Sequence, residues 1–232
     1  IRDSWYSLQK ILREEWVEFS LSELEQEEPE ELMMHPLRLA LEVQSLMNQN
    51  DWLVIDGGNT HFWSEIAVNM AGAQGKELAG ILHPGSFSML GVGVSFGLAA
   101  KLNHPKDRVV VISGDGAFLS GGLSIEAAFQ ENVPITVVID NNGGLTTISQ
   151  QQERLFADER HVATDFRDIP FHTMFEGMGG HGELVEKPED LKPALERALS
   201  SGKTACVNVR TRSAISPIVL ATTSKRDKAS IE

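Results

Sequence analysis

Cysteine and basic side chains are scarce in this 232-residue sequence. The single cysteine, Cys206, cannot form an internal disulfide, so we expect a small core residue and, by default, a reducing cytoplasmic location. Twenty Lys and Arg face 33 Asp and Glu, which gives a formal net charge of −13. This balance argues against nucleic acid or an anionic membrane as the main partner, because both need clustered basic residues. A phosphate ligand would instead need backbone N–H groups or a divalent cation.

Long apolar runs are also missing. No stretch reaches the roughly 18 apolar residues of a membrane span, and the first ten residues lack the basic and apolar regions of a signal peptide. The sequence therefore predicts neither feature. Residue 1 is Ile rather than Met, so we expect the chain to be part of a larger protein.

Composition divides the chain into three parts. Residues 1–34 are expected to form a helical connector followed by an acidic linker, with the folded domain at 35–212 and a tail at 213–232 that is a possible active-site lid. Residues 22–31 contain six Glu and one Pro, a composition typical of a solvated linker. The amphipathic pattern of the connector helix consists of Trp5, Leu8, Leu12, Trp16 and Phe19.

Between residues 35 and 212, short continuous apolar runs alternate with helical patterns. Strands are predicted over residues 52–55, 108–113, 135–139 and 205–209. Helices are predicted from Pro36 and over residues 91–102, 123–131 and 191–200. This alternation predicts an α/β fold with a doubly wound, mainly parallel sheet and helices on both faces. Ligands of such sheets bind beyond the carboxyl ends of the strands.

Two loops fit that position. Gly114-Asp115-Gly116 follows one predicted strand, and Asn141-Asn142-Gly143-Gly144 follows the next. The glycines allow tight turns and a close approach of backbone N–H groups to an anion, but Asp115 would repel the anion unless a cation intervened. Mg²⁺ resolves this conflict, with Asp115, the Asn142 amide oxygen and the Gly144 carbonyl as hard oxygen ligands.

Each loop alone is a weak signal, but their spacing is specific. Gly-Asp-Gly, 24 further residues and Asn-Asn resembles the cofactor motif of thiamine diphosphate enzymes. The resemblance covers about residues 35–210 and is closest to the acetolactate synthase, 2-hydroxyacyl-CoA lyase and oxalyl-CoA decarboxylase branch. It implies the thiamine diphosphate-binding fold, with thiamine diphosphate and Mg²⁺ as cofactors.

The resemblance also implies roles for single residues. Leu90, in SMLGVGVSFGLAAKL, would be the apolar wedge that bends the cofactor, and the Ser88 carbonyl would face the aminopyrimidine, although the family usually has glycine there. The diphosphate would contact Asn59, Thr60, Gly114, Gly116 and Ala117.

Other positions keep two interpretations. Leu90 is alternatively a plain core leucine, and His83, which precedes Pro84-Gly85 near the expected thiazolium, is either catalytic or a solvated loop histidine. Thr147, Ile148 and Gln151 should line the pocket mouth, and Gln151 stands where acetolactate synthases typically have tryptophan. In the tail, the basic residues are expected either to neutralise coenzyme A phosphates or to remain solvated; they are Lys225, Arg226 and Lys228.

No segment matches the family's catalytic glutamate, which lies in a separate pyrimidine-binding domain or subunit. The resemblance therefore implies an inactive chain on its own and a homotetramer or heteromer. Our first hypothesis is a carbon–carbon lyase acting on 2-hydroxyacyl-CoA or a related small acyl-CoA. The second is an acetolactate synthase-like carboligase or 2-oxoacid decarboxylase, and the third is a non-catalytic partner subunit.

Overall fold

The computed structural model describes residues 33–156 and 161–223, together with residues 7, 10, 14, 15, 17, 18, 21 and 22. The apolar residues that predict the N-terminal helix, most of the acidic segment and the basic tail residues lie outside this part of the chain.

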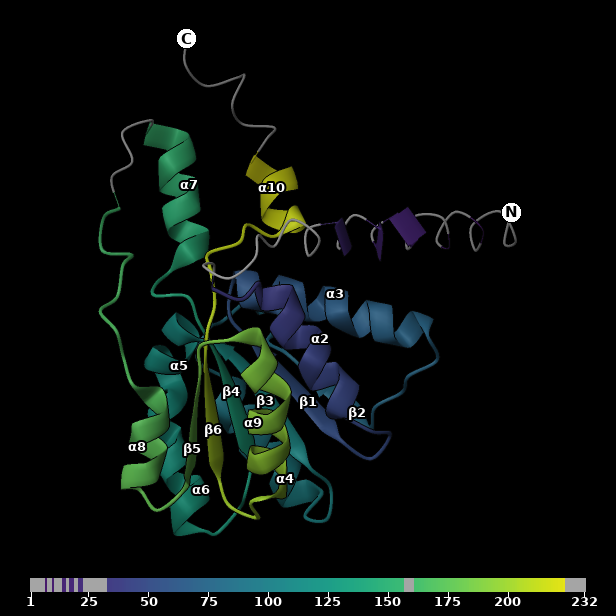
Figure 1. Cartoon of the computed structure of the whole chain (residues 1–232), viewed down its shortest axis with the longest axis vertical. Coiled ribbons are helices and arrows are strands. Elements are labelled where there is room, and N and C mark those ends of the chain that lie inside the picture. The colour runs from purple at the N-terminus through teal and green to yellow at the C-terminus, as the bar shows by residue number, and fades with distance from the viewer. Residues whose placement is uncertain are drawn as a thin grey trace.

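A six-stranded parallel sheet forms the centre of the described part, in the order β2-β1-β3-β4-β6-β5 (Figure 1). The strands are β1 (Trp52–Asp56), β2 (Gly80–Leu82), β3 (Val109–Gly114), β4 (Thr136–Asn141), β5 (His181–Val185) and β6 (Ala205–Arg210). The central strands β3 and β4 are buried along their whole length. The predicted doubly wound α/β fold is confirmed.

Helices cover both faces of the sheet. Alternate residues of the strands point to opposite sides, so Leu53 and Ile55 pack in one apolar core while Val54 packs in the other. The first core includes α2 (Pro36–Leu46) and α9 (Pro188–Ser200), and the second includes α4 (Gly93–Asn103), α5 (Asp115–Gly121), α6 (Glu126–Gln130) and α8 (Phe171–Gly177). Cys206 is fully buried in the second core, as predicted.

The remaining helices lie around the carboxyl ends of the strands. Helix α3 (Asn59–Ala73) packs on α2 through Trp63, Ile66 and Ala67. Helices α7 (Thr146–Phe156) and α10 (Pro217–Thr223) stand above the sheet in Figure 1. Two 3₁₀ turns, η1 (Gly85–Phe87) and η2 (Gly122–Ile125), complete the described elements between residues 33 and 223.

The predicted helix over residues 123–131 is confirmed at α6, but its first residues belong to the 3₁₀ turn η2, and the short helix before it was not predicted. Helix α5 starts directly after β3, and η2 separates it from α6. Gly121 lies against the Gly91 backbone, where a Cβ atom would be 2.0 Å from the Gly91 carbonyl oxygen. Local periodicity does not report this tertiary contact, which lies at the end of α5.

None of the described helices is both long and apolar enough to cross a membrane.

Candidate functional site

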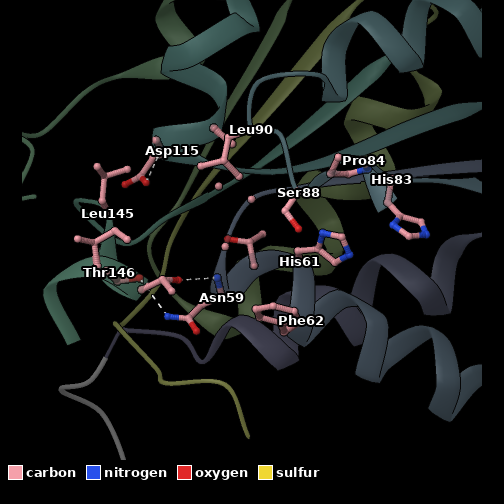
Figure 2. A pocket seen from close by; sticks show the side chains of 18 of the residues that line it. Asn59, His61, Phe62, His83, Pro84, Ser88, Leu90, Asp115, Leu145 and Thr146 are labelled. Carbon is pink, nitrogen blue, oxygen red and sulfur yellow. Dashed lines mark hydrogen bonds between the residues drawn. The ribbon is translucent and has the colours of Figure 1, made fainter. Parts of the chain in front are cut away.

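A cavity of about 670 Å³ opens at the carboxyl ends of β1, β3 and β4 (Figure 2). Its walls come from the start of α3, the segment between β2 and α4, the start of α5, and the loop from β4 into α7. The structure brings all twelve sequence-predicted site residues to this one cavity: Asn59, Thr60, His83, Ser88, Leu90, Gly114, Asp115, Gly116, Ala117, Asn142, Gly144 and Thr147. Ile148 also lines it, but Gln151, the third residue predicted at the pocket mouth, is not among the residues that line the cavity.

Asp115 is the first residue of α5, and its side chain is buried between two loops. Its Oδ1 accepts a hydrogen bond from the Gly116 N–H at 2.6 Å, and its Oδ2 accepts from the N–H groups of Gly143 and Gly144 at 2.8 and 3.0 Å. Burial, together with the nearby Asp140 carboxylate, raises the pKa of Asp115 to about 7, against the opposing effect of these N–H donors. The carboxylate therefore ties the two predicted metal-binding loops together.

Asn142 and Gly144 complete an oxygen-rich group beside Asp115. The Asn142 Oδ1 atom is buried and receives no hydrogen bond from any described residue. Such an oxygen is costly to bury unless a ligand satisfies it. Gly144 has room only for a hydrogen, because a Cβ atom there would lie 2.3 Å from the Thr164 carbonyl oxygen. One carboxylate, one free amide oxygen and one backbone carbonyl suit a hard divalent cation.

Behind this group, Asp140 connects the start of α3 to the segment after β6. It is fully buried at the end of β4 and accepts hydrogen bonds from the Thr60 hydroxyl, at 2.7 Å, and from the Thr211 hydroxyl. Burial raises the pKa of Asp140. The Thr60 side chain therefore donates to the protein itself. Sequence analysis did not single out Asp140, although it directly precedes the Asn-Asn motif.

Asn59 joins three segments at the start of α3. Its backbone N–H donates to the Thr147 Oγ1 at 3.0 Å, and its Oδ1 accepts from the Ser216 N–H at 3.1 Å. Gly58 permits this approach, because a Cβ atom there would be 2.5 Å from Thr147 Oγ1. The first residues after β6 therefore pack against the start of α3, and both Ala214 and Ser216 are buried.

Leu90 lies on a short loop that Asp56 fixes. The Asp56 carboxylate accepts hydrogen bonds from the Gly91 N–H, at 3.0 Å to Oδ2, and from the Gly93 N–H at 2.7 Å. Leu90 is 40 % exposed and lines the cavity, so it is not a core leucine in this chain (Figure 2). Ser88 has a φ of +49°, a left-handed conformation that favours the glycine usual in the family.

Histidines gather at the other end of the cavity from Asp115 (Figure 2). His83 Nδ1 accepts from the Gly85 N–H at 3.2 Å, and the His83 ring meets the His61 ring edge to face at 5.2 Å. His61 Nε2 lies 2.9 Å from the Glu65 carboxylate, one turn along α3. Sequence analysis missed His61 and Glu65. Their spacing of four residues becomes a signal only once residues 59–73 are known to be helical.

Comparison with known proteins agrees with this geometry. Residues 56–209 match the family described as thiamine pyrophosphate enzyme, C-terminal TPP binding domain. The chain is 36 % identical over 180 residues to an acetolactate synthase large subunit from Mycobacterium tuberculosis. This match covers 77 % of this chain and 31 % of that protein. It is 30 % identical over 174 residues to the 2-hydroxyacyl-CoA lyase 2 of Mus musculus, covering 75 % of this chain and 26 % of the relative.

A catabolic acetolactate synthase from Raoultella terrigena is 28 % identical over 176 residues, which cover 76 % of this chain and 30 % of that protein. In each of these comparisons the match spans less than a third of the relative's length. The matched family segment includes the cavity residues from Gly57 to Ile148. This chain belongs to the thiamine pyrophosphate enzyme family and carries its C-terminal TPP-binding domain.

Proposed function

We propose that this chain is the diphosphate- and Mg²⁺-binding part of a thiamine diphosphate-dependent carbon–carbon lyase. One observation carries the proposal: the Asp115 carboxylate and the unsatisfied Asn142 Oδ1 line the same cavity, in a chain whose family binds this cofactor. A cation bound at Asp115 would satisfy this oxygen, which no described residue does.

The described residues fit both groups. Mg²⁺ would be held by Asp115, Asn142 and the Gly144 carbonyl, which are oxygen ligands of the kind that this ion prefers. The diphosphate would meet the loop around Gly58 and Asn59 and the start of α5 at Gly116 and Ala117. When bound, thiamine diphosphate supplies an electron sink for breaking or forming a carbon–carbon bond beside a carbonyl.

The chain's own residues divide the remaining tasks. The three N–H donors around Asp115 fix its carboxylate toward the adjoining loops. Leu90 presents an apolar surface to the cavity from a loop that Asp56 immobilises, which suits a wedge against a bent cofactor. His83 lies at the opposite end from Asp115, where a proton donor or acceptor would face the substrate.

For the substrate, we propose a 2-hydroxyacyl-CoA. The similarity to 2-hydroxyacyl-CoA lyases supports this choice. So does Gln151, on the same helix as the cavity residue Ile148, which stands in place of the tryptophan typical of acetolactate synthases. The second candidate is an acetolactate synthase-like carboligase, favoured by the 36 % identity to the mycobacterial protein. Either activity needs a pyrimidine-binding domain or subunit that provides the catalytic glutamate. We propose that the assembled enzyme is a cytoplasmic oligomer.

Cofactor binding tests the first part of the proposal. The chain in its native assembly is dialysed against thiamine diphosphate and MgCl₂, and both are then quantified, the cofactor by thiochrome fluorescence. Asp115→Asn should weaken cofactor binding by about 100-fold, at the upper end of the effects measured around metal sites. The matched control is Asp190→Asn, which changes an exposed carboxylate on α9. Equal binding by Asp115→Asn, or no binding by the wild type, would refute the proposal.

Product analysis separates the two substrate candidates. Cleavage of a 2-hydroxyacyl-CoA between C1 and C2 gives an aldehyde and formyl-CoA, with the hydroxyl proton balancing the new formyl hydrogen. Two molecules of pyruvate would instead give acetolactate and CO₂. We expect the assembled enzyme to release aldehyde from the thioester faster than it forms acetolactate, and the reverse preference would select the carboligase.

A further inference from the structure

A second group of ligand-type side chains lies in the cavity, at the end away from Asp115 (Figure 2). His61 and Glu65 come from successive turns of α3, and His83 comes from the segment after β2. One ligand atom from each residue lies within 4.8 Å of the others. The proposed diphosphate site uses none of these three side chains.

The chemistry of the group suits a transition metal. Two imidazoles and one carboxylate form the ligand set of many zinc sites that keep a fourth position open. Zinc–nitrogen bonds of about 2.0–2.1 Å place tetrahedral ligand atoms about 3.3 Å apart. His61 and Glu65 are already 2.9 Å apart, and His83 is exposed on its loop, so a small movement of His83 would close the set.

The electrostatics of the cavity also favour a cation. Glu65 and Asp115 both line it, and no Lys or Arg is among the described residues that do so. His61 is 9 % exposed, and its Nε2 faces the Glu65 carboxylate. A metal ion between these residues and His83 would offset the negative charge of the Glu65 carboxylate.

Another histidine of the chain provides a contrast. His161 also lies between two acids, but its Nδ1 faces Asp165 at 3.0 Å while its Nε2 faces Glu153 at 2.6 Å. The carboxylates are therefore on opposite sides of the ring, and one ion cannot reach all three groups. Convergence on one point distinguishes the cavity group from this surface ion pair.

We propose that His61, Glu65 and His83 bind one Zn²⁺ ion at the end of the cavity away from Asp115. The open coordination position would face the cavity, because all three ligands line it. Water or a substrate oxygen would occupy that position. The proposal goes beyond cofactor binding and does not depend on it. With Zn²⁺ bound, His83 would act through the ion in place of the direct proton transfer proposed above.

Calorimetric titration of the full chain with ZnCl₂ tests the proposal, with excess MgCl₂ present to occupy sites built from oxygen ligands alone. We expect one Zn²⁺ per chain. His61→Ala, Glu65→Gln and His83→Ala should each weaken binding by at least about 10-fold, the lower end of effects at metal sites. Co²⁺ in place of Zn²⁺ should give the visible absorption of a four-coordinate nitrogen and oxygen site.

The controls keep the outcomes separate. His161→Ala should bind Zn²⁺ as the wild type does, and Asp115→Asn should lose the proposed cofactor binding while keeping Zn²⁺. Because His83 is an exposed loop residue, His83→Ala should unfold at the wild-type temperature, which excludes misfolding as the cause of a loss. Absence of Zn²⁺ binding, or unchanged binding in His83→Ala, would overturn the proposal.

Discussion

The loop after β4 approaches Asp115 only because Gly144 has no Cβ atom. At Gly144, a Cβ atom would meet the Thr164 backbone oxygen at 2.3 Å, and backbone cannot move aside as a flexible side chain can. The Gly144 N–H also donates to Asp115. A side chain at this position would therefore push the loop, with its carbonyl, away from the carboxylate.

Gly144→Ala should accordingly lower the free energy of unfolding by about 1–3 kcal/mol, the usual range for overpacking. It should also weaken binding of thiamine diphosphate and Mg²⁺. Gly177→Ala is the matched control, because Gly177 has no atom near its Cβ position and no positive φ. Urea denaturation and cofactor dialysis measure both effects, and wild-type behaviour of Gly144→Ala would contradict this account.

The protonation of one buried histidine, His35, makes the free energy of unfolding depend on pH. Its Nδ1 accepts from the Leu37 N–H at the start of α2, and its ring meets Trp63 edge to face. Burial, with a smaller effect from Arg212, lowers the pKa of His35 from 6.5 to about 4. Between these values the unfolded chain binds the extra proton, so the contribution of His35 to stability is complete above pH 6.5 and is lost as the pH falls toward 4.

His35→Asn should remove this dependence while keeping an acceptor for the Leu37 N–H, because Asn also caps helices. The shift corresponds to about 3 kcal/mol between pH 6.5 and pH 4. We expect the difference in unfolding free energy between the wild type and His35→Asn to change by an amount of that order over this range. Urea titrations at several pH values measure it, and parallel pH profiles would disprove the prediction.

At the scale of elements, a buried aspartate lies at each end of β1, and the two carboxylates hold different parts of the fold. Asp51, just before the strand, binds the Arg108 side chain and the Asn48 N–H. Asp56, the last strand residue, binds the backbone of the loop that carries Leu90 into α4. Burial raises the pKa of Asp56, partly offset by these N–H donors. Both acids stabilise the fold, but only Asp56 holds a loop that lines the cavity, through Leu90.

Comparison of Asp56→Asn with Asp51→Asn tests this division. Each should lower the unfolding free energy by about 1.5–3 kcal/mol, the range for hydrogen bonds to charged groups. Only Asp56→Asn should also weaken cofactor binding, because it releases the loop at Gly91. A loss of affinity in both variants would show that general destabilisation is responsible.

At the scale of the whole molecule, apolar side chains are exposed beside the cavity. Phe87 is 88 % exposed and Met89 57 %, and both flank Ser88 on the Leu90 loop. Exposed apolar groups this close together typically mark an interaction surface. We expect the pyrimidine-binding domain or subunit proposed above to cover this surface.

Phe87→Ser should therefore weaken assembly with that partner and leave the unfolding temperature of the chain nearly unchanged. The matched control is Leu102→Ser, which changes a 63 % exposed leucine at the far end of α4. Sedimentation velocity measures assembly in both variants. Equal effects of the two substitutions would argue against a surface specific to the Leu90 loop.

The sequence by itself determined the sheet and the two loops proposed to bind the metal, because both depend on local patterns. Continuous apolar runs marked the four buried strands, and the spacing of the two loops marked Asp115 and Asn142 before any contact was known. The edge strands β2 and β5 escaped detection, since one has three residues and the other is only partly buried.

Tertiary structure alone decided how distant residues support the site. Asp56 reaches Gly91 across 35 positions, Asn59 reaches Ser216 across 157, and His61 meets His83 although no motif links them. Periodicity reports which face of an element is buried, but not which side chain of another element will face it. That choice depends on how the packed helices bring their ends together over the sheet.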